Sequence, residues 1–452
     1  MDFFKLISLI FSFAISNLYM QAQKPLTLKE CVDYSMTNNS NIKIANFNID
    51  ISQKKVAEQI GSFLPQINFS GTIDNNLKLS TQLLPAEMMG GESGTYIPVK
   101  FGNKYSVNGG IQFTQKIYDP QSLLLIKTAK LNKNIALTTM QQTQELSAYN
   151  VCLVFFQTVI IKMQMNVLKS TLNSSEELLK SISLKYNNGM AKKIDVDKIQ
   201  VSYNNTKSQL DQSELNYYQS LNSLKLNMGM PVDSTLSLAD TNIVVSYNLF
   251  AVDSAFKYQI DDVIDYQLQK SNTSLMQLKK KAQLYANQPS LSFYGNYNYN
   301  AMRQEFNFFD KSKDWFPSSG VGIKLTIPIF SGLQRNSKLA QSDLNVKIAN
   351  ESLDQTEQSI KVIIYNYFIQ YKNALNNIVD EKANLELAES VFKNSQLEYN
   401  QGSCSTIDLI QSENSYLVAQ SNYYNKLLNL FIARIEYEKA KGSLMSFLNN
   451  LK

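Results

Sequence analysis

The stretch YNNGMAKKID at residues 186–195 returns as YNQGSCSTID at residues 399–408. Tyr, Asn, Gly, Ile and Asp recur in register, and the two copies begin at Tyr186 and Tyr399, 213 positions apart. A Gly that follows one long helical pattern and precedes another is typical of a helix end and a turn. The same turn in both halves of the chain indicates a duplicated unit.

Other features recur in the same order. Pro65, Phe69 and Gly71 return as Pro289, Phe293 and Gly295, and Gly110, Ile111, Thr114 and Ile117 return as Gly322, Ile323, Thr326 and Ile329. We therefore predict a first repeat at 23–250 and a second at 251–452. The first holds a helix (27–61), a hairpin (66–118), a long helix (120–188), a helix (194–228) and a connector (232–250). The second holds a helix (253–286), a hairpin (290–330), a long helix (332–399) and a helix (407–447).

The hairpins have the alternation of β-strands that face two different environments. Ile67, Phe69, Gly71 and Ile73 alternate with polar residues, and the second hairpin adds Tyr294, Tyr297, Tyr299, Phe308, Phe309, Trp315 and Phe316. Such strands resemble those of outer-membrane proteins with aromatic girdles. Four strands are too few to close a barrel in lipid, so a symmetric oligomer must complete it. Eight strands from a dimer would be filled by side chains, whereas twelve from a trimer could leave a channel.

The two long helices predict rods. Each predicted segment of about 68 residues would be about 100 Å long, and two shorter helices stacked end to end would match it. In the second long helix, apolar residues follow a 4,3,4,3,4 spacing that is typical of coiled coils, at Ile360, Ile364, Tyr367, Tyr371, Ala374 and Ile378. The turns at 186–195 and 399–408 would then form the closed mouth of a tube.

Composition excludes several classes of function. The chain has no His, so Ser-His-Asp and Cys-His nucleophiles and His-containing metal sites are absent. The three cysteines, Cys31, Cys152 and Cys404, are far apart and predict isolated thiols, and the net charge of +5 without a basic block gives no indication of nucleic-acid binding. No cofactor is expected and an enzyme is disfavoured. Three Met pairs (88/89, 163/165 and 228/230) suggest copper export as a hypothesis, but Met more often fills gaps between packed helices.

The amino terminus predicts export. Residues 1–22 have the layout of a secretory signal peptide, with Lys5 before an apolar core and cleavage after Ala22. Cys31 lies well beyond that point, so no lipoprotein site is evident. The apolar run at 151–163 is interrupted by Gln157 and Lys162, and we expect no transmembrane helix in the mature chain.

In its duplicated plan, its PIFSG stretch at 328–332 and its paired turns, nearly the whole mature chain resembles the TolC family of outer-membrane efflux proteins. The resemblance implies a mainly α fold with membrane β-structure: a long antiparallel α-barrel and four transmembrane strands per protomer, which complete a 12-stranded barrel in a homotrimer. It implies a passive exit duct in the outer membrane, extending into the periplasm. Its partners would be a periplasmic adaptor (membrane fusion) protein, an inner-membrane pump of the RND or ABC type, and outer-membrane lipid. The connector and the segment at 23–27 would lie at a mid-height belt.

The resemblance also implies a gate at the periplasmic turns. Tyr399 fits the locking Tyr of the family, Asp195 the locking Asp, and Asp408 the first carboxylate of the ring at the constriction. Two positions depart from the pattern, because Cys404 stands where an Arg is expected and Gln411 where the second ring aspartate is expected. Lys192 or Lys193 could pair with an aspartate instead. Cys404 could be a reactive thiol, but we favour a small residue that caps a helix.

Two functions from different classes remain open at this stage. The first is the exit duct of a tripartite efflux or type I secretion system. The alternative is a periplasmic coiled-coil structural or adaptor protein that never enters the membrane. Drugs, peptides, proteins and metals all remain open as cargo.

Overall fold

The computed structural model describes residues 25–239 and 258–450. These residues fold into two compact units, one formed by the described parts of 1–49, 136–270 and 352–452, the other by 50–135 and 271–351. Each unit draws on both halves of the sequence, so the compact units differ from the duplicated repeats. The predicted signal peptide and the end of the connector, 240–250, lie outside the described residues.

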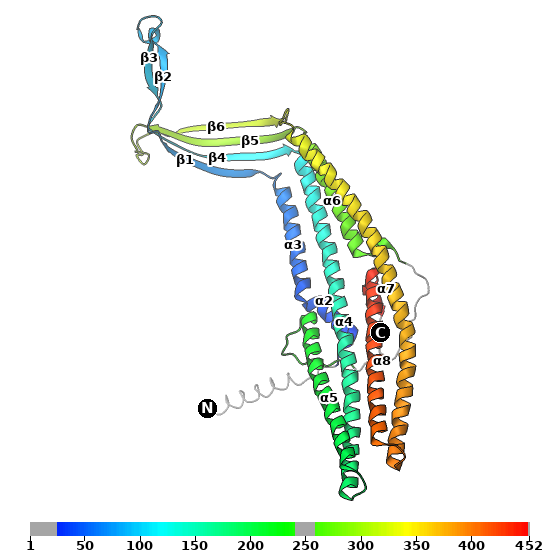
Figure 1. Ribbon diagram of the computed structural model, residues 1–452. Helices are drawn as coiled ribbons and strands as arrows, with labels where there is room; N and C mark the ends of the chain where they lie inside the picture. Colours follow the sequence, from blue (N-terminus) through cyan, green and yellow to red (C-terminus); the bar gives the residue numbers. More distant parts are fainter. Residues whose placement is uncertain (1–24, 240–257, 451–452) are drawn as a thin grey trace, which may run out of the picture. The chain divides into compact units, whose positions relative to one another are not determined.

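The second unit contains a four-stranded antiparallel sheet in the order β1-β4-β5-β6. Its strands are β1 (Gln66–Asn75), β4 (Tyr105–Tyr118), β5 (Ser290–Arg303) and β6 (Phe316–Thr326). Phe69 lies opposite Ile111, and Ile111 lies opposite Tyr297. The β4–β5 pair therefore joins the hairpins of the two repeats into one sheet (Figure 1).

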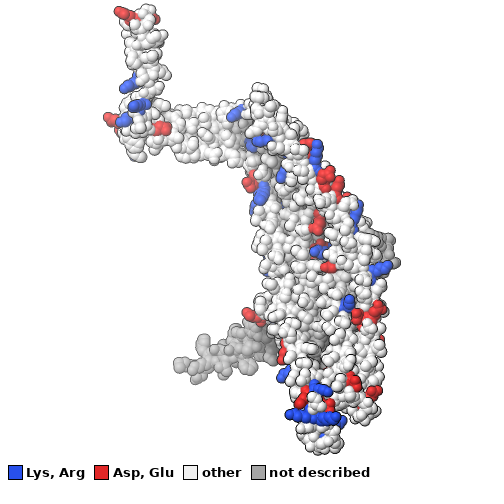
Figure 2. Space-filling view, in the orientation of Figure 1, with Lys and Arg blue, Asp and Glu red and all other residues white. Residues whose placement is uncertain are grey.

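The sheet leaves its large apolar side chains exposed. Phe69 is 75% exposed and Val321 79%, although residues of this kind are normally covered in a water-soluble sheet. Figure 2 shows a visible face of the strands that is almost free of charge, with Lys, Arg, Asp and Glu gathered toward the strand ends. These strands suit a lipid environment.

Between β1 and β4 the predicted hairpin at 66–118 carries a second, two-stranded hairpin, which the sequence did not predict. Strand β2 (Ser80–Pro85) pairs with β3 (Tyr96–Phe101) across the short helix η2 (Ala86–Met89). The Glu87 carboxylate accepts hydrogen bonds from the Ser93 hydroxyl and from the Gly94 N–H. This local bonding stabilises a turn whose sequence carries no strong hairpin signal.

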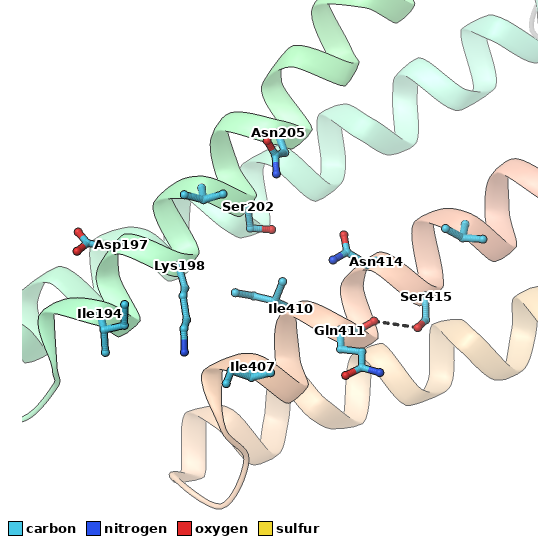
Figure 3. Close-up of a pocket in the computed structure, with 12 residues that line it drawn as sticks. Ile194, Asp197, Lys198, Ser202, Asn205, Ile407, Ile410, Gln411, Asn414 and Ser415 are labelled. Carbon is cyan, nitrogen blue, oxygen red and sulfur yellow. Dashed lines mark hydrogen bonds between the residues drawn. The ribbon is translucent and has the colours of Figure 1, made fainter.

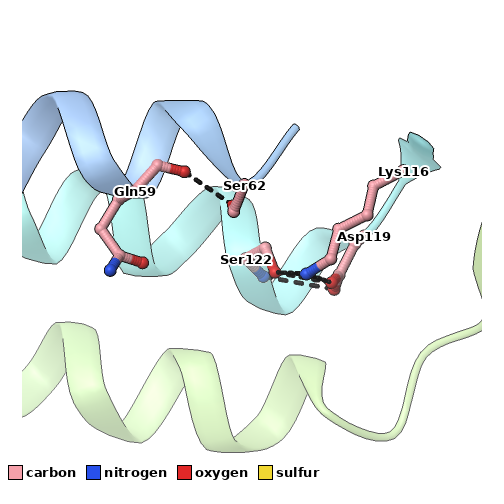
Figure 4. Close-up of polar contacts among 5 residues, drawn as sticks. All are labelled: Gln59, Ser62, Lys116, Asp119 and Ser122. Atoms are coloured by element: carbon pink, nitrogen blue, oxygen red, sulfur yellow. Dashed lines mark hydrogen bonds and ion pairs between the residues drawn. The ribbon is translucent and has the colours of Figure 1, made fainter. Parts of the chain in front are cut away.

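Helix α4 (Pro120–Asn187) starts directly after β4. Asp119 precedes the Pro, and its carboxylate accepts hydrogen bonds from the N–H and the hydroxyl of Ser122 and from Lys116 Nζ, at 3.2, 2.6 and 2.9 Å (Figure 4). Asp at the N-cap followed by Pro is a favourable helix start. Nearby, Ser62 follows the end of α3 (Ser40–Gly61), and its hydroxyl caps the last turn by donating to the Gln59 carbonyl.

The first unit is helical. It contains α2 (Leu28–Asn38), α5 (Lys193–Met228), α8 (Thr406–Ala440) and α9 (Leu444–Asn450), with the adjoining parts of α4 and of α7 (Gln334–Gln401). Figure 1 shows α5 beside α4 and α8 beside α7. Phe156 of α4 stacks on Phe431 of α8 with ring centroids 4.4 Å apart, so the core joins helices of both repeats.

The helix predicted over 27–61 begins with a capping box formed by Thr27 and Glu30, but it is interrupted at Asn39. At the interruption, Gly229, which follows the end of α5, approaches the backbone of Asn38 closely. A Cβ on Gly229 would lie 2.5 Å from the Asn38 carbonyl oxygen. The Asn39 amide also donates to the Asn227 carbonyl at 2.7 Å. A tertiary contact therefore sets this helix boundary.

The second repeat has the equivalent interruption. Of the helix predicted at 253–286, residues 253–257 lie outside the described part of the chain, and the remainder holds η5 (Ile260–Asp262) followed by α6 (Ile264–Tyr285). The helix predicted at 407–447 ends at Ala440. Gly442 follows that end, and a Cβ on it would lie 2.4 Å from the Asp262 carbonyl oxygen. Both predictions gave continuous helices where backbones of distant segments touch.

Among the described residues, α4 is the one helix long and apolar enough to cross a membrane by length and composition. Val151, Phe155 and Val159 of this helix are buried in the core, so packing explains their apolar character. The start of the connector pairs with the segment predicted to lie beside it: Leu26 forms a parallel bridge with Leu238.

Candidate functional site

The two predicted turns have the same backbone conformation. Gly189 has a φ of 72° and Gly402 a φ of 79°, in the left-handed region that favours glycine. In each turn the Gly N–H bonds to the carbonyl three residues before, and the next N–H bonds to the carbonyl five residues before it. This is the hydrogen-bond pattern of a glycine-terminated helix.

Tyr399 belongs to a hydrophobic cluster whose buried residues come from four helices. Its side chain is 8% exposed and packs with Ile182 of α4, Ile199 of α5, Phe392 of α7 and Leu409 of α8. Lys185 Nζ lies 5.7 Å from the centroid of the Tyr399 ring. The structure therefore places the predicted locking Tyr where it connects both helix pairs.

Asp408 lies in the first turn of α8 and bonds locally. The Ser405 hydroxyl donates to Asp408 Oδ2 at 2.6 Å, and the Asp408 N–H donates to Ser405 Oγ at 3.2 Å. Ser405 is therefore the N-cap of α8. The second carboxylate oxygen and the exposed side chain leave Asp408 available to ions.

The other predicted partners of the lock are not joined within one chain. In the described ranges 25–239 and 258–450, no hydrogen bond connects Tyr399 with Asp195, and neither Lys192 nor Lys193 forms an ion pair with Asp195 or Asp408. Asp195 lies in the first turn of α5, whose N-cap is Lys192 without a side-chain bond. Among the described residues, the predicted lock residues are therefore connected to the other helices by packing around Tyr399 and not by an ion pair of Asp195 or Asp408.

Cys404 is partly buried beside the second turn, and its Sγ lies 3.5 Å from the Ser405 carbonyl oxygen. Burial raises the pKa of the Cys404 thiol, and the carboxylates of Asp408 and Glu398 raise it further. Since the thiolate is the reactive form, this environment lowers reactivity at neutral pH. Cys404 does not cap the helix, because Ser405 does; that prediction was wrong.

Gln411 lies one turn after Asp408 on the wall of a groove between α5 and α8 (Figure 3). Most residues of this groove are apolar or uncharged, and Asp197 and Lys198 of α5 are the exceptions. Ile194 and Ile407, which recur between the two turns, both line it. At this level α8 presents the Gln411 amide, where the sequence resemblance implies a second aspartate.

Sequence reasoning overlooked one residue of this region. Glu413 is 5% exposed and lies on the core-facing side of α8, which also buries Leu409, Gln420 and Tyr424. Its carboxylate accepts hydrogen bonds from two serines of other helices. The signal in the sequence was that Glu413, a charged residue, lies at helical spacing from residues that are buried. Among the described residues, no group of three or more His, Cys, Asp or Glu could hold a metal.

An open antiparallel sheet with exposed apolar strands, together with long antiparallel helices in two copies, defines a channel-forming protein of the outer membrane. The family model for outer membrane efflux proteins matches residues 33–230 and 266–443. The chain belongs to this family, and the fold class predicted from sequence is confirmed. Its location is the cell outer membrane, from which it extends into the periplasm.

Known proteins of this kind are distant in sequence and close in fold. The outer membrane protein TolC of Escherichia coli K12 is 20% identical over 364 residues, covering 76% of this chain and 70% of TolC. The CmeC outer membrane channel of Campylobacter jejuni matches with a TM-score of 0.69 at 15% identity, covering 92% of this chain and 86% of CmeC. The open-state MtrE outer membrane channel of Neisseria gonorrhoeae matches with a TM-score of 0.67 at 14% identity, covering 92% of this chain and 89% of MtrE. Both CmeC and MtrE are outer membrane channels.

Proposed function

We propose that this protein is a passive exit duct, formed by three copies of the chain, in a tripartite efflux or type I secretion system. The observation that carries the proposal is the open sheet: β1 and β6 are its edge strands. Backbone groups at an open edge have no partners in lipid. If β6 of one copy pairs with β1 of the next, three copies close twelve strands around a channel.

The partners follow from the same assignment. A duct without catalytic machinery needs an energy source, which an inner-membrane pump of the RND or ABC type would supply. A periplasmic adaptor would connect the two proteins. TolC is an outer membrane protein, and CmeC and MtrE are outer membrane channels; similarity to them supports the duct over a periplasmic adaptor-like protein.

The test combines location, assembly and conduction. We expect the protein to be extracted with the outer membrane, to run as a heat-modifiable trimer on gels, and to form ion channels in planar bilayers. Removal of the chain should lower export of the substrates of its partner pump. A water-soluble monomer that forms no channel would instead support the periplasmic alternative.

We further infer that the turns at 186–195 and 399–408 form the periplasmic gate. Three copies of Asp408 would then make a ring of carboxylates, which favours cations and binds polyvalent ones in a narrow pore. Gln411 would make a neutral ring one turn away, and Tyr399 and Asp195 would belong to the closed arrangement. Asp408→Ala should lower cation selectivity. Unchanged selectivity in Asp408→Ala would exclude the ring.

A further inference from the structure

A buried carboxyl group links three helices next to the second turn. Ser175 Oγ of α4 donates to Glu413 Oε1 at 2.7 Å, and Ser202 Oγ of α5 donates to Glu413 Oε2 at 3.0 Å. Glu413 is 5% exposed and Ser175 4%. We refer to Ser175, Ser202 and Glu413 as the Glu413 cluster.

The partners of this carboxyl group are hydroxyls only. In the part of the chain that the structure describes, no Lys or Arg forms an ion pair with Glu413. A buried carboxyl group is costly unless it is hydrogen-bonded, so the two serines stabilise its position between the helices. Water can replace both hydroxyls as a donor. The two hydrogen bonds therefore stabilise the packing of α8 against α4 and α5. They can also break without leaving a Lys or Arg unpaired, because both donors are hydroxyls.

The position of the cluster connects it with the gate. Glu413 lies five residues after Asp408 on the helix that follows the second turn, whereas Ser175 and Ser202 lie on the two helices that flank the first turn. The cluster therefore joins the second turn to both helices of the first. Among the described residues, Asp195 supplies no such polar link to Tyr399.

We propose that Glu413, bonded to Ser175 and Ser202, is the polar lock that holds α8 against α4 and α5 in the closed tip. It takes the place of the Arg-dependent contact for which this chain has Cys404. This inference rests on the proposed function, because a lock requires a gated duct. Glu413 acts as a positioning residue that keeps helices together and need not touch the cargo.

The first experiment measures single-channel conductance in planar bilayers. Glu413→Ala should raise conductance several-fold, or lengthen the open time, because α8 loses its only polar link to the other helix pair in this cluster. Ser175→Ala combined with Ser202→Ala should act in the same direction, since the carboxyl group then loses both donors. The heat-modifiable trimer should persist in each variant, which separates a gating effect from a failure to fold.

Two matched controls are present in the same helices. Ser412, next to Glu413, is also buried, but its hydroxyl donates to the Leu409 carbonyl of its own helix at 2.8 Å. Ser183 of α4 likewise donates to the Leu179 carbonyl at 2.7 Å. Ser412→Ala and Ser183→Ala each remove a hydroxyl without removing a link between helices. Both should leave conductance at the wild-type level.

A covalent version of the link provides a second, independent readout. Ser202→Cys and Glu413→Cys are combined in a Cys404→Ser background, and diamide oxidises the two thiols to one disulfide while it is itself reduced to the hydrazine. The oxidised channel should conduct poorly. Reduction should restore conductance to the level of Glu413→Ala, because the reduced variant lacks the carboxyl link.

The outcomes separate the two proposals. If the wild-type protein forms no channel, the proposed function fails and gating is irrelevant. If the wild type forms channels but Glu413→Ala conducts like Ser412→Ala, the duct stands and the Glu413 lock is overturned. A disulfide variant that conducts equally well when oxidised and reduced would also overturn the lock.

Discussion

The turns at 186–195 and 399–408 have matching backbones and different surroundings. Their glycines differ in φ by only a few degrees and form the same pair of hydrogen bonds. However, Tyr186 is 42% exposed, whereas Tyr399 is 8% exposed inside a four-helix cluster. Ser405 caps the helix after the second turn, but Lys192 gives no side-chain bond at the equivalent place.

The difference indicates that the two turns contribute unequally to the stability of this region. A glycine-terminated turn depends on local backbone geometry, so both copies keep it wherever the chain reverses direction. Packing depends on what lies opposite, and only the second turn has its Tyr surrounded by α4, α5 and α8. The second turn therefore carries most of the stabilising contacts, and substitutions in the two turns should have unequal effects.

The largest difference in destabilisation between the two turns should come from substitution of their tyrosines. Tyr399→Ala leaves a cavity in a buried cluster and should destabilise the closed helix ends by about 3 kcal/mol, as truncations of large buried aromatic residues do. Tyr186→Ala, at an exposed position, should cost about 0.5 kcal/mol or less. Hydrogen exchange of the α7 and α8 amides near the turn measures the change. A difference of this size corresponds to roughly a hundredfold faster exchange. Similar rates in the two variants would show that the second turn has no special packing role.

The glycines should behave alike. An added Cβ meets no atom within 4 Å at either Gly189 or Gly402, so Gly→Ala tests the backbone conformation alone. Each substitution should destabilise its own turn by about 1 to 2 kcal/mol, because an L-residue is strained in the left-handed region. Local hydrogen exchange of each turn provides the measurement. Unequal costs at the two positions would mean that the turns differ in backbone as well as in packing.

The helix caps should give a smaller effect of opposite sign in the two copies. Ser405→Ala removes the hydroxyl that bonds to Asp408 and should cost about 1 kcal/mol. Lys192→Ser should instead stabilise the start of α5 by a similar amount, since it adds a cap and removes a positive charge from a helix N-terminus. Exchange of the first-turn amides of α5 and α8 tests both substitutions. No gain in Lys192→Ser would mean that the first turn cannot adopt the cap geometry.

Much of the fold followed from the sequence because it depends on local patterns. Alternation predicted the four strands of the sheet, the absence of Pro and Gly predicted the long helices, and the repeated Gly predicted the turns. The interruptions near Asn39 and Val263 could not be predicted in this way. They arise where Gly229 and Gly442 bring a distant backbone within contact distance, and no helical periodicity registers such a contact.

The candidate site was predictable in position and less so in chemistry. The repeated motif located Tyr399, Asp408 and Asp195 at the turns, since Gly determines where the helices end. The bonds that these residues make depend on the side chains of other helices. Glu413 illustrates the limit: its burial is compatible with its spacing along α8, but its partners Ser175 and Ser202 lie more than two hundred residues away in sequence.

The smallest expected effect concerns thiol reactivity at equivalent positions of the two turns. Ala191 is the counterpart of Cys404, and Lys185 is the counterpart of Glu398, which helps to raise the pKa of the Cys404 thiol. Ala191→Cys in a Cys404→Ser background should therefore react with a maleimide several-fold faster at pH 7 than Cys404 does, because more of it is thiolate. Both rates should rise with pH, and the rate for Cys404 should level off at the higher pH. Cys31 and Cys152 are fully buried and should contribute little background. Equal rates across pH 6 to 9 would mean that Glu398 does not distinguish the second turn from the first, since Asp195 is the counterpart of Asp408.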